Sequence, residues 1–272
     1  MRFISWNVQR RASGLPDQIK ALNDRQPDVI ALQEVTQYTA SLFFKVLPTI
    51  RLNNISDSFS LARDKEILKG PRRYGELIAS RWPLNSIFPT SFRIPWPERV
   101  LSVEINSPVG LIECHTTHIP PGASNGWIKI ETLEGIYNRL AIPNTKLRIL
   151  CGDFNTPKEE TQAGQVVTWA ERRKKNGDTV LVSNRGNRWD AAERNVLVGL
   201  KKFDLSDVYR YLYGYMVQDY SWYTNNKGIR IGRRFDHVFA SQALNPVSCR
   251  YLESLREEGL SDHSPIEVEF RL

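Results

Sequence analysis

Apolar strands that end in a polar side chain recur along this chain. Residues 2–7 alternate between the two sides of an extended segment, which predicts a strand that ends at Asn7. Residues 29–34 are apolar until Glu34 closes the run, as in a strand that is covered on both faces. The first two predicted strands therefore each present one polar side chain at the carboxyl end.

The clearest strand end lies within residues 147–157. A short apolar strand stops at Gly152, a residue that suits backbone turning sharply or passing close to another segment. Asp153 and Asn155 follow on the same side of an extended segment. Because Gly, Asp and Asn are also common turn residues, this stretch alone is equally compatible with an ordinary turn.

Strand alternation and helical spacing of apolar residues predict most of the remaining elements. Residues 49–73 have a polar, basic composition that indicates a loop, and residues 158–189 show no clear pattern. No repeat or linker divides the chain, so a single domain over residues 1–272 is expected. The other predicted elements are a helix that begins at Pro16, helices over 127–140 and 191–200, and strands over 74–80, 100–105, 110–115, 234–239, 246–255 and 266–271.

Composition and charge narrow the class of protein. Hydrophobic residues make up 41% of the 272, which is ordinary for a globular chain with a sizeable core. The net charge of +7 favours a polyanionic partner such as nucleic acid. The chain opens directly on a strand and has no membrane-length apolar run, so we expect a cytoplasmic protein without a signal peptide or membrane partner. No protein partner is evident, and a monomer is expected.

The polar residues at the strand ends form a chemically coherent set. Carboxylates and amides supply oxygen ligands, and the three cysteines form no cluster, so Mg²⁺, or Mn²⁺ in its place, is expected rather than zinc. Mg²⁺ keeps water positions that a substrate phosphate can displace, which makes phosphoester hydrolysis the natural reaction. The residues of the set are Asn7, Glu34, His118, Asp153, Asn155, Asp236, Asp262 and His263.

Several of these residues sit in motifs whose order along the chain resembles that of the endonuclease/exonuclease/phosphatase superfamily. The resemblance implies an α/β (α+β) fold: a four-layered sandwich of two packed, mostly antiparallel sheets flanked by helices. The motifs are SWN at Ser5–Asn7, LQE at Leu32–Glu34, GDFN at Gly152–Asn155, FD at Phe235–Asp236 and SDHSP at Ser261–Pro265.

Within the superfamily, the chain is most similar to exonuclease III and the apurinic/apyrimidinic endonucleases. LSDVYR at Leu205–Arg210 and YSWY at Tyr220–Tyr223 resemble segments of that branch. Two positions depart from its pattern. His118 stands where the branch has tyrosine, and Arg233 stands where it often has a tryptophan that lines the pocket for a baseless sugar.

The resemblance implies a metal-dependent phosphodiester hydrolase, most simply a DNA endonuclease or exonuclease. The alternative is a phosphoesterase of the same superfamily that acts on small-molecule or lipid phosphates. The implied catalytic residues are His118, Asp153, Asn155, Asp236 and His263; the implied metal-binding residues are Asn7, Glu34 and Asp262; and the expected substrate contacts are Trp222, Arg233 and Arg234.

Overall fold

The apolar alternation along the strands is realised as two stacked six-stranded sheets. The computed structural model describes residues 1–62, 64–87 and 92–271. The first sheet contains one parallel pair, β1 with β2, and its other neighbours are antiparallel. From edge to edge its strands are β17 (Pro246–Tyr251), β18 (Ile266–Phe270), β1 (Arg2–Asn7), β2 (Val29–Val35), β4 (Gly75–Ser80) and β3 (Asn54–Asp57).

The second sheet repeats this arrangement. Its one parallel pair joins β7 to β8, and the remaining neighbours are antiparallel. The mostly antiparallel character expected from the sequence is therefore confirmed in both sheets. The strands are, in order, β13 (Ser206–Asp207), β16 (Asp236–Ala240), β8 (Leu147–Asp153), β7 (Gly110–His118), β6 (Val100–Ser107) and β5 (Leu84–Ile87).

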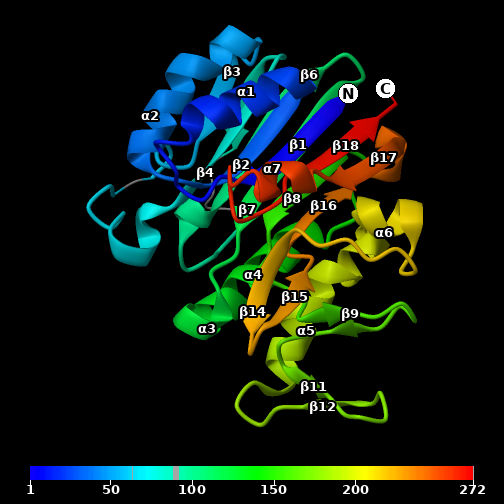
Figure 1. Cartoon of the computed structure of the whole chain (residues 1–272). Coiled ribbons are helices and arrows are strands. Elements are labelled where there is room, and N and C mark those ends of the chain that lie inside the picture. Colours follow the sequence, from blue (N-terminus) through cyan, green and yellow to red (C-terminus); the bar gives the residue numbers. More distant parts are fainter. Residues whose placement is uncertain (63, 88–91, 272) are drawn as a thin grey trace.

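Strand alternation sends side chains into three apolar layers. Phe3 of β1 points between the sheets, where it joins Ile149 of β8 in the central core. Its neighbour Ile4 points outward and packs with Leu22 and other residues beneath α1 and α2. Leu150 of β8 likewise points outward, into the layer under α4 and α5. Both faces of both sheets are thus covered, which gives the four-layered sandwich (Figure 1).

Helices and short hairpins complete the fold. The helices are α1 (Leu15–Arg25), α2 (Gln37–Val46), α3 (Gly122–Asn125), α4 (Trp127–Leu140), α5 (Gly186–Leu197), α6 (Val208–Tyr213) and α7 (Glu253–Glu257). Three two-stranded sheets lie outside the sandwich: β9 (Glu159–Glu160) with β10 (Val166–Val167), β11 (Glu171–Arg173) with β12 (Thr179–Leu181), and β14 (Trp222–Asn226) with β15 (Ile229–Arg233). Within the described residues, no helix has the length and apolar character needed to cross a membrane.

Several sequence predictions are corrected by the structure. Residues 49–73 are not all loop, because β3 forms an edge strand within them. Residues 158–189 carry four short strands and the start of α5, which begins at Gly186 rather than at residue 191. The strand predicted over residues 246–255 ends at Tyr251, and α7 follows. Helix α2 was not predicted, although a capping box of Thr36 and Thr39 marks its start.

Gly152 fulfils the expectation of a close backbone approach. A Cβ atom on this residue would lie 1.9 Å from the carbonyl oxygen of Thr117 on β7, and its φ of +133° is rarely adopted by other residues. Only glycine therefore lets β7 and β8 remain paired up to their last residues, His118 and Asp153, which face each other in the ladder.

Candidate active site

The carboxyl ends of β1, β2, β7 and β8 meet at one rim of the sandwich. In the second sheet, Asp153 lies opposite His118 on β7 and opposite Asp236 at the start of β16. In the first sheet, β1 ends at Asn7 and the end of β2 carries Glu34. The pairing of strands, and not proximity in sequence, brings these side chains together.

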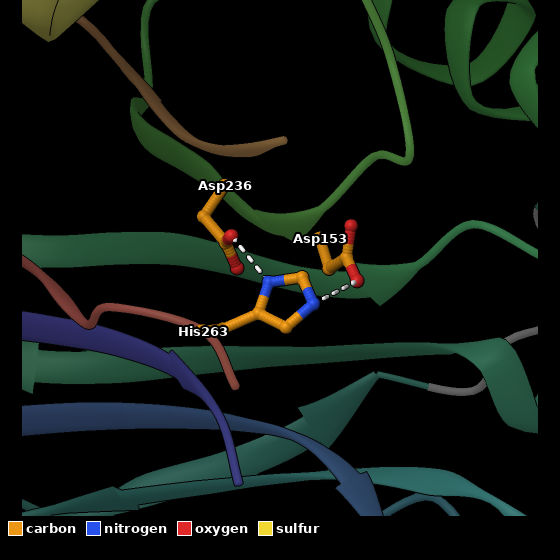
Figure 2. Close-up of side chains that lie close together, drawn as sticks. All are labelled: Asp153, Asp236 and His263. Atoms are coloured by element: carbon orange, nitrogen blue, oxygen red, sulfur yellow. Dashed lines mark hydrogen bonds and ion pairs between the residues drawn. The ribbon is translucent and has the colours of Figure 1, made fainter. Parts of the chain in front are cut away.

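A chain of three buried groups forms the centre of the site. His263 Nδ1 lies 2.7 Å from Asp236 Oδ2, and His263 Nε2 lies 3.7 Å from Asp153 Oδ2. Figure 2 shows the imidazole of His263 between the two carboxylates. Backbone contacts hold the chain in place, because Ser221 Oγ accepts hydrogen bonds from the amides of Phe235 and Asp236.

The environment of these three groups raises two pKa values, those of His263 and Asp153. Burial alone would lower the pKa of His263, but the carboxylates of Asp236 and Asp153 outweigh it and raise the pKa to about 10. Burial raises the pKa of Asp153 to about 7, and the charge of Asp236 adds to the shift. At neutral pH, His263 is therefore a cation next to a carboxyl group that is poised to exchange a proton.

Asn7 connects the group of Asp236, His263 and Asp153 to the first sheet. Its Nδ2 donates to Asp153 Oδ2 at 3.0 Å and to Glu34 Oε1 at 3.3 Å. Glu34 reaches this position through an irregularity in the ladder between β2 and β4 and a φ of +56°. Its side chain is 21% exposed, whereas that of Asp153 is 2% exposed. Glu34 is thus the more accessible of these two carboxylates.

His118 is held in one tautomer by an arginine that the sequence reasoning missed. The guanidinium of Arg99 lies 2.6 Å from His118 Nδ1, and since a guanidinium can only donate, Nδ1 accepts. Burial, together with the charges of Arg99 and His263, lowers the pKa of His118 well below its usual value. His118 is therefore neutral, with its proton on Nε2, which lies 3.8 Å from Glu34 Oε1 and 3.7 Å from Asp153 Oδ2.

A second unforeseen residue, Glu76 on β4, is buried near the site. Neither of its carboxyl oxygens has a hydrogen-bond partner among the described residues. Burial raises its pKa well above the usual range, and the charge of Arg99 only partly opposes this shift. The one sequence signal for Glu76 was an acidic residue inside an otherwise apolar strand.

Asn155 borders the site and adopts a left-handed conformation, with φ of +50°. Its Nδ2 donates to the carbonyl of Ile119 at 2.9 Å, which leaves the second amide hydrogen unassigned. The backbone carbonyl of Asn155 accepts hydrogen bonds from Lys129 Nζ and Trp169 Nε1, each at 3.0 Å. These contacts fix the turn after β8, and nothing in the local sequence pattern predicted them.

Two further predicted residues, Asp262 and Arg234, differ in their exposure and contacts. Asp262 is exposed and has only a minor electrostatic effect on His263. Arg234 is buried in ion pairs with Glu160 and Asp207, at 2.6 and 2.8 Å, so its guanidinium is already occupied. This arrangement favours a structural role for Arg234 over the expected contact with substrate.

Trp222 and Arg233 instead line a pocket of about 250 Å³ that reaches Asn155. Trp222 stacks on Phe235, with ring centroids 5.4 Å apart and an interplanar angle of 22°. Arg233 is half-buried, and no carboxylate among the described residues lies within ion-pair distance of it. The pocket therefore combines aromatic faces with an unpaired cation.

The donor set fits a divalent cation. Asp153, Asp236 and His263 each offer a ligand atom, and these atoms lie within 4.8 Å of one another. A protonated imidazole cannot ligate a metal, however, so the charge state of His263 favours a hydrogen-bonding role for this group. Glu34, accessible and next to Asn7, is then the carboxylate best suited to hold a hard cation such as Mg²⁺.

Comparison with solved structures shows the same fold in other proteins. An AP endonuclease from Archaeoglobus fulgidus matches with a TM-score of 0.73 and 20% identity over 100% of both chains. The 3′ phosphatase NExo from Neisseria, bound to a product DNA hairpin, matches with a TM-score of 0.63 and 18% identity over 100% of both chains. A humanized D. rerio TDP2 matches with a TM-score of 0.63 and 15% identity, covering 100% of this chain and 99% of that one.

The sequence comparison agrees with the fold. No curated protein matches the chain. The model of the Endonuclease/Exonuclease/phosphatase family, however, matches residues 4–263, which include both ends of the site from Asn7 to His263. The chain therefore belongs to the endonuclease/exonuclease/phosphatase family and is a hydrolase of that family.

Proposed function

We propose that the protein is a Mg²⁺-dependent DNA nuclease of the exonuclease III or apurinic/apyrimidinic endonuclease type. The observation that carries this proposal is the charge around the site: unpaired arginines lie on both sides of an acidic centre. Such a layout suits a polyanion that crosses the centre, whereas a small phosphate ester needs cations at one point only.

On one side, the ring of Tyr74 gathers three guanidinium groups. Arg10, Arg73 and Arg99 lie 5.4, 4.8 and 5.3 Å from its centroid, and Arg99 also contacts His118. On the other side, Arg185 and Arg233 line the aromatic pocket. None of these arginines has a carboxylate of the described residues within ion-pair distance, and Arg99 is also buried.

Asp153 is the proposed general base. Its pKa of about 7 lets it accept a proton from the attacking water and still be substantially ionised at neutral pH. The Asn7 amide and the backbone amide of Asn155 hydrogen-bond its two oxygens, at 3.0 and 2.9 Å, and so fix the carboxylate in one orientation. From this position Asp153 would orient and deprotonate a water for in-line attack on the phosphodiester.

The two imidazoles are the proposed donors to the phosphoryl group. Cationic His263 would donate from Nε2, and neutral His118 would donate from its own Nε2, as negative charge builds on the phosphoryl oxygens. Glu34, with Asn7 beside it, would hold the divalent cation, which when bound offsets the charge of the nonbridging and leaving oxygens. The second Nδ2 hydrogen of Asn155 is available as a further donor.

The relatives support DNA as the substrate class. An AP endonuclease and a 3′ phosphatase bound to a DNA hairpin share the fold over their full length. Arg233 stands where the branch often has tryptophan, and it puts a cation in the aromatic pocket. Recognition of a baseless sugar therefore needs a direct test.

The test is cleavage of two duplexes that differ by a single abasic-site analogue, in Mg²⁺ and in EDTA. Bis-p-nitrophenyl phosphate serves as a generic diester, and Asp153→Ala as the inactive control. Metal-dependent cleavage of either duplex that is lost in Asp153→Ala supports the proposal, and a preference for the abasic duplex identifies a repair endonuclease. Hydrolysis of the small diester with both duplexes intact would instead identify a small-molecule phosphoesterase.

A further inference from the structure

A second hollow lies on the outer side of the β14–β15 hairpin, away from the catalytic centre. Its volume is about 530 Å³, and its lining includes residues of β9, β14 and β15. These three strands are labelled in Figure 1. Neighbouring residues of β14 face different hollows, because Trp222 and Thr224 line the pocket near Asn155 while Tyr223 lines the outer one. Arg233 borders both hollows and connects them. We call the outer hollow the hairpin cleft.

The carboxylates of the hairpin cleft are already neutralised. Glu160 forms ion pairs with Arg210 and Arg234, at 2.8 and 2.6 Å, and its pKa is held at about 2 despite its burial. Glu159 pairs with Arg173 at 2.5 Å. Both carboxylates thus have arginine partners of their own, and Glu159 offsets only part of the charge of Lys158 and Arg233, whose pKa values are lowered despite it.

Three cations remain without an ion-pair partner among the described residues: Lys158, Arg230 and Arg233. The Nε atom of Arg233 is buried and has no hydrogen-bond partner there either. Burial lowers the pKa of Lys158, and repulsion by Arg233 lowers it further. The cleft thus concentrates positive charge that an anionic group would relieve.

Aromatic faces alternate with these cations. The ring of Tyr220 lies flat against Gly232, where a Cβ atom would come within 2.3 Å of the ring, so glycine is needed for this packing. Tyr223 meets Tyr220 edge to face, with centroids 5.8 Å apart, and the guanidinium of Arg230 lies 3.9 Å from the Tyr223 centroid. Guanidinium planes and tyrosine rings are the surfaces on which unpaired nucleic-acid bases stack.

We propose that the hairpin cleft binds an unpaired nucleotide segment of the substrate, adjacent to the strand that occupies the catalytic centre. Phosphates would contact Lys158, Arg230 and Arg233, and a base would stack beside Tyr220 or on Arg230. Duplex DNA does not meet these requirements, because its bases are stacked on one another and cannot enter a hollow. The inference rests on the proposed action on DNA, which it refines to substrates that carry a single-stranded extension.

The experiment compares three labelled duplexes of equal paired length: blunt, with a four-nucleotide 3′ extension, and with a four-nucleotide 5′ extension. Binding is followed by fluorescence anisotropy in EDTA at several salt concentrations. One extended duplex should bind at least about tenfold more tightly than the blunt one, as expected for one stacked base with its phosphate contacts. Its slope of log affinity against log salt should also be steeper, by about 0.7 for each added phosphate contact.

Arg230→Ala is the informative variant, because Arg230 is exposed on the hairpin and its loss leaves the core intact. It should reduce the affinity ratio of extended to blunt duplex toward one. Lys45→Ala, which removes an exposed cation on the distant helix α2, is the matched control and should leave the ratio unchanged.

Equal binding of all three duplexes, or a ratio that survives in Arg230→Ala, would overturn the proposed subsite. Cleavage assayed separately in Mg²⁺ distinguishes this failure from failure of the proposed nuclease. If the blunt duplex is cleaved while the extension gives no gain, only the subsite is wrong. If no duplex is bound or cleaved, both proposals are wrong.

Discussion

The two imidazoles of the site are held in opposite charge states by their immediate partners. Asp236 contacts His263 Nδ1 and favours the cation, whereas Arg99 contacts His118 Nδ1 and favours the neutral ring. One ring therefore offers a charged donor and the other a neutral donor on either side of Asp153. This division of roles depends on two hydrogen bonds and can be tested one residue at a time.

We expect a bell-shaped dependence of kcat/KM on pH. Activity should rise as Asp153 loses its proton near pH 7 and fall as His263 loses its proton near pH 10. Asp236→Asn removes the carboxylate that chiefly raises the His263 pKa, so the alkaline limb should move to lower pH. Asp262→Asn, at an exposed neighbour of His263, is the control and should leave the profile nearly unchanged. Identical alkaline limbs in the two variants would contradict this account.

The sequence pointed to residues at strand ends, which the structure brings together, and missed the residues behind them. Asp153 stands out because it follows an apolar run, His118 because it lies just past a predicted strand, and His263 because it belongs to the SDHSP motif. Arg99, just before β6, and Glu76, on β4, carry no such signal, since their surroundings arise only where β4 of the first sheet packs against β6 and β7 of the second. A polar residue whose role is to orient another one has no pattern of its own in the sequence.

At the scale of elements, the junction between β15 and β16 separates two adjacent arginines. Arg233 faces the two hollows, while Arg234 points inward to Glu160 of β9 and Asp207 of β13. The charge of Arg234 helps hold the pKa of the Asp207 carboxyl well below its usual range, against the effect of burial. Arg234 therefore ties β9 and β13 to β16.

We expect Arg234→Met to lower the free energy of unfolding by about 3–5 kcal/mol, because it leaves two buried carboxylates without their shared partner. Arg233→Met should change stability by less than about 1 kcal/mol, since its side chain is half-buried and unpaired. Its effect should appear in DNA affinity instead. Urea denaturation and anisotropy on both variants measure the two effects, and similar losses of stability would refute the distinction.

The sequence predicts long elements well and short ones poorly. Strands such as β1, β2 and β8 are buried on both faces, so their apolar runs are unmistakable. Edge strand β3 and the hairpins within residues 158–189 have strands of only two to four residues, which are too short to show a clear alternation, and their formation depends on the neighbours they pair with. The side of the fold that carries the aromatic pocket was therefore the part least visible in the sequence.

The whole molecule combines a net charge of +7 with a candidate site that is rich in carboxylates. Unpaired cations lie on both sides of this centre: Arg10 and Arg73 near Tyr74, and Arg185 and Arg233 in the aromatic pocket. The overall field would attract a polyanion, and the local acidic groups would select the position at which a cation and a phosphate are accommodated together. The dependence of affinity on salt distinguishes binding of a polyanion along several cations from recognition of a single phosphate.

If a duplex contacts these four cations, its affinity should fall roughly 100-fold between 50 and 200 mM salt, because each phosphate contact contributes about 0.9 to the slope of log affinity against log salt. Hydrolysis of bis-p-nitrophenyl phosphate should change far less, since that substrate reaches only the centre. Arg73→Ala should reduce the slope for the duplex by about 0.9, and Lys45→Ala should not alter it. A duplex affinity that is insensitive to salt would show that the cations on the two sides do not act on one continuous polyanion, and would favour a small phosphate ester as the substrate.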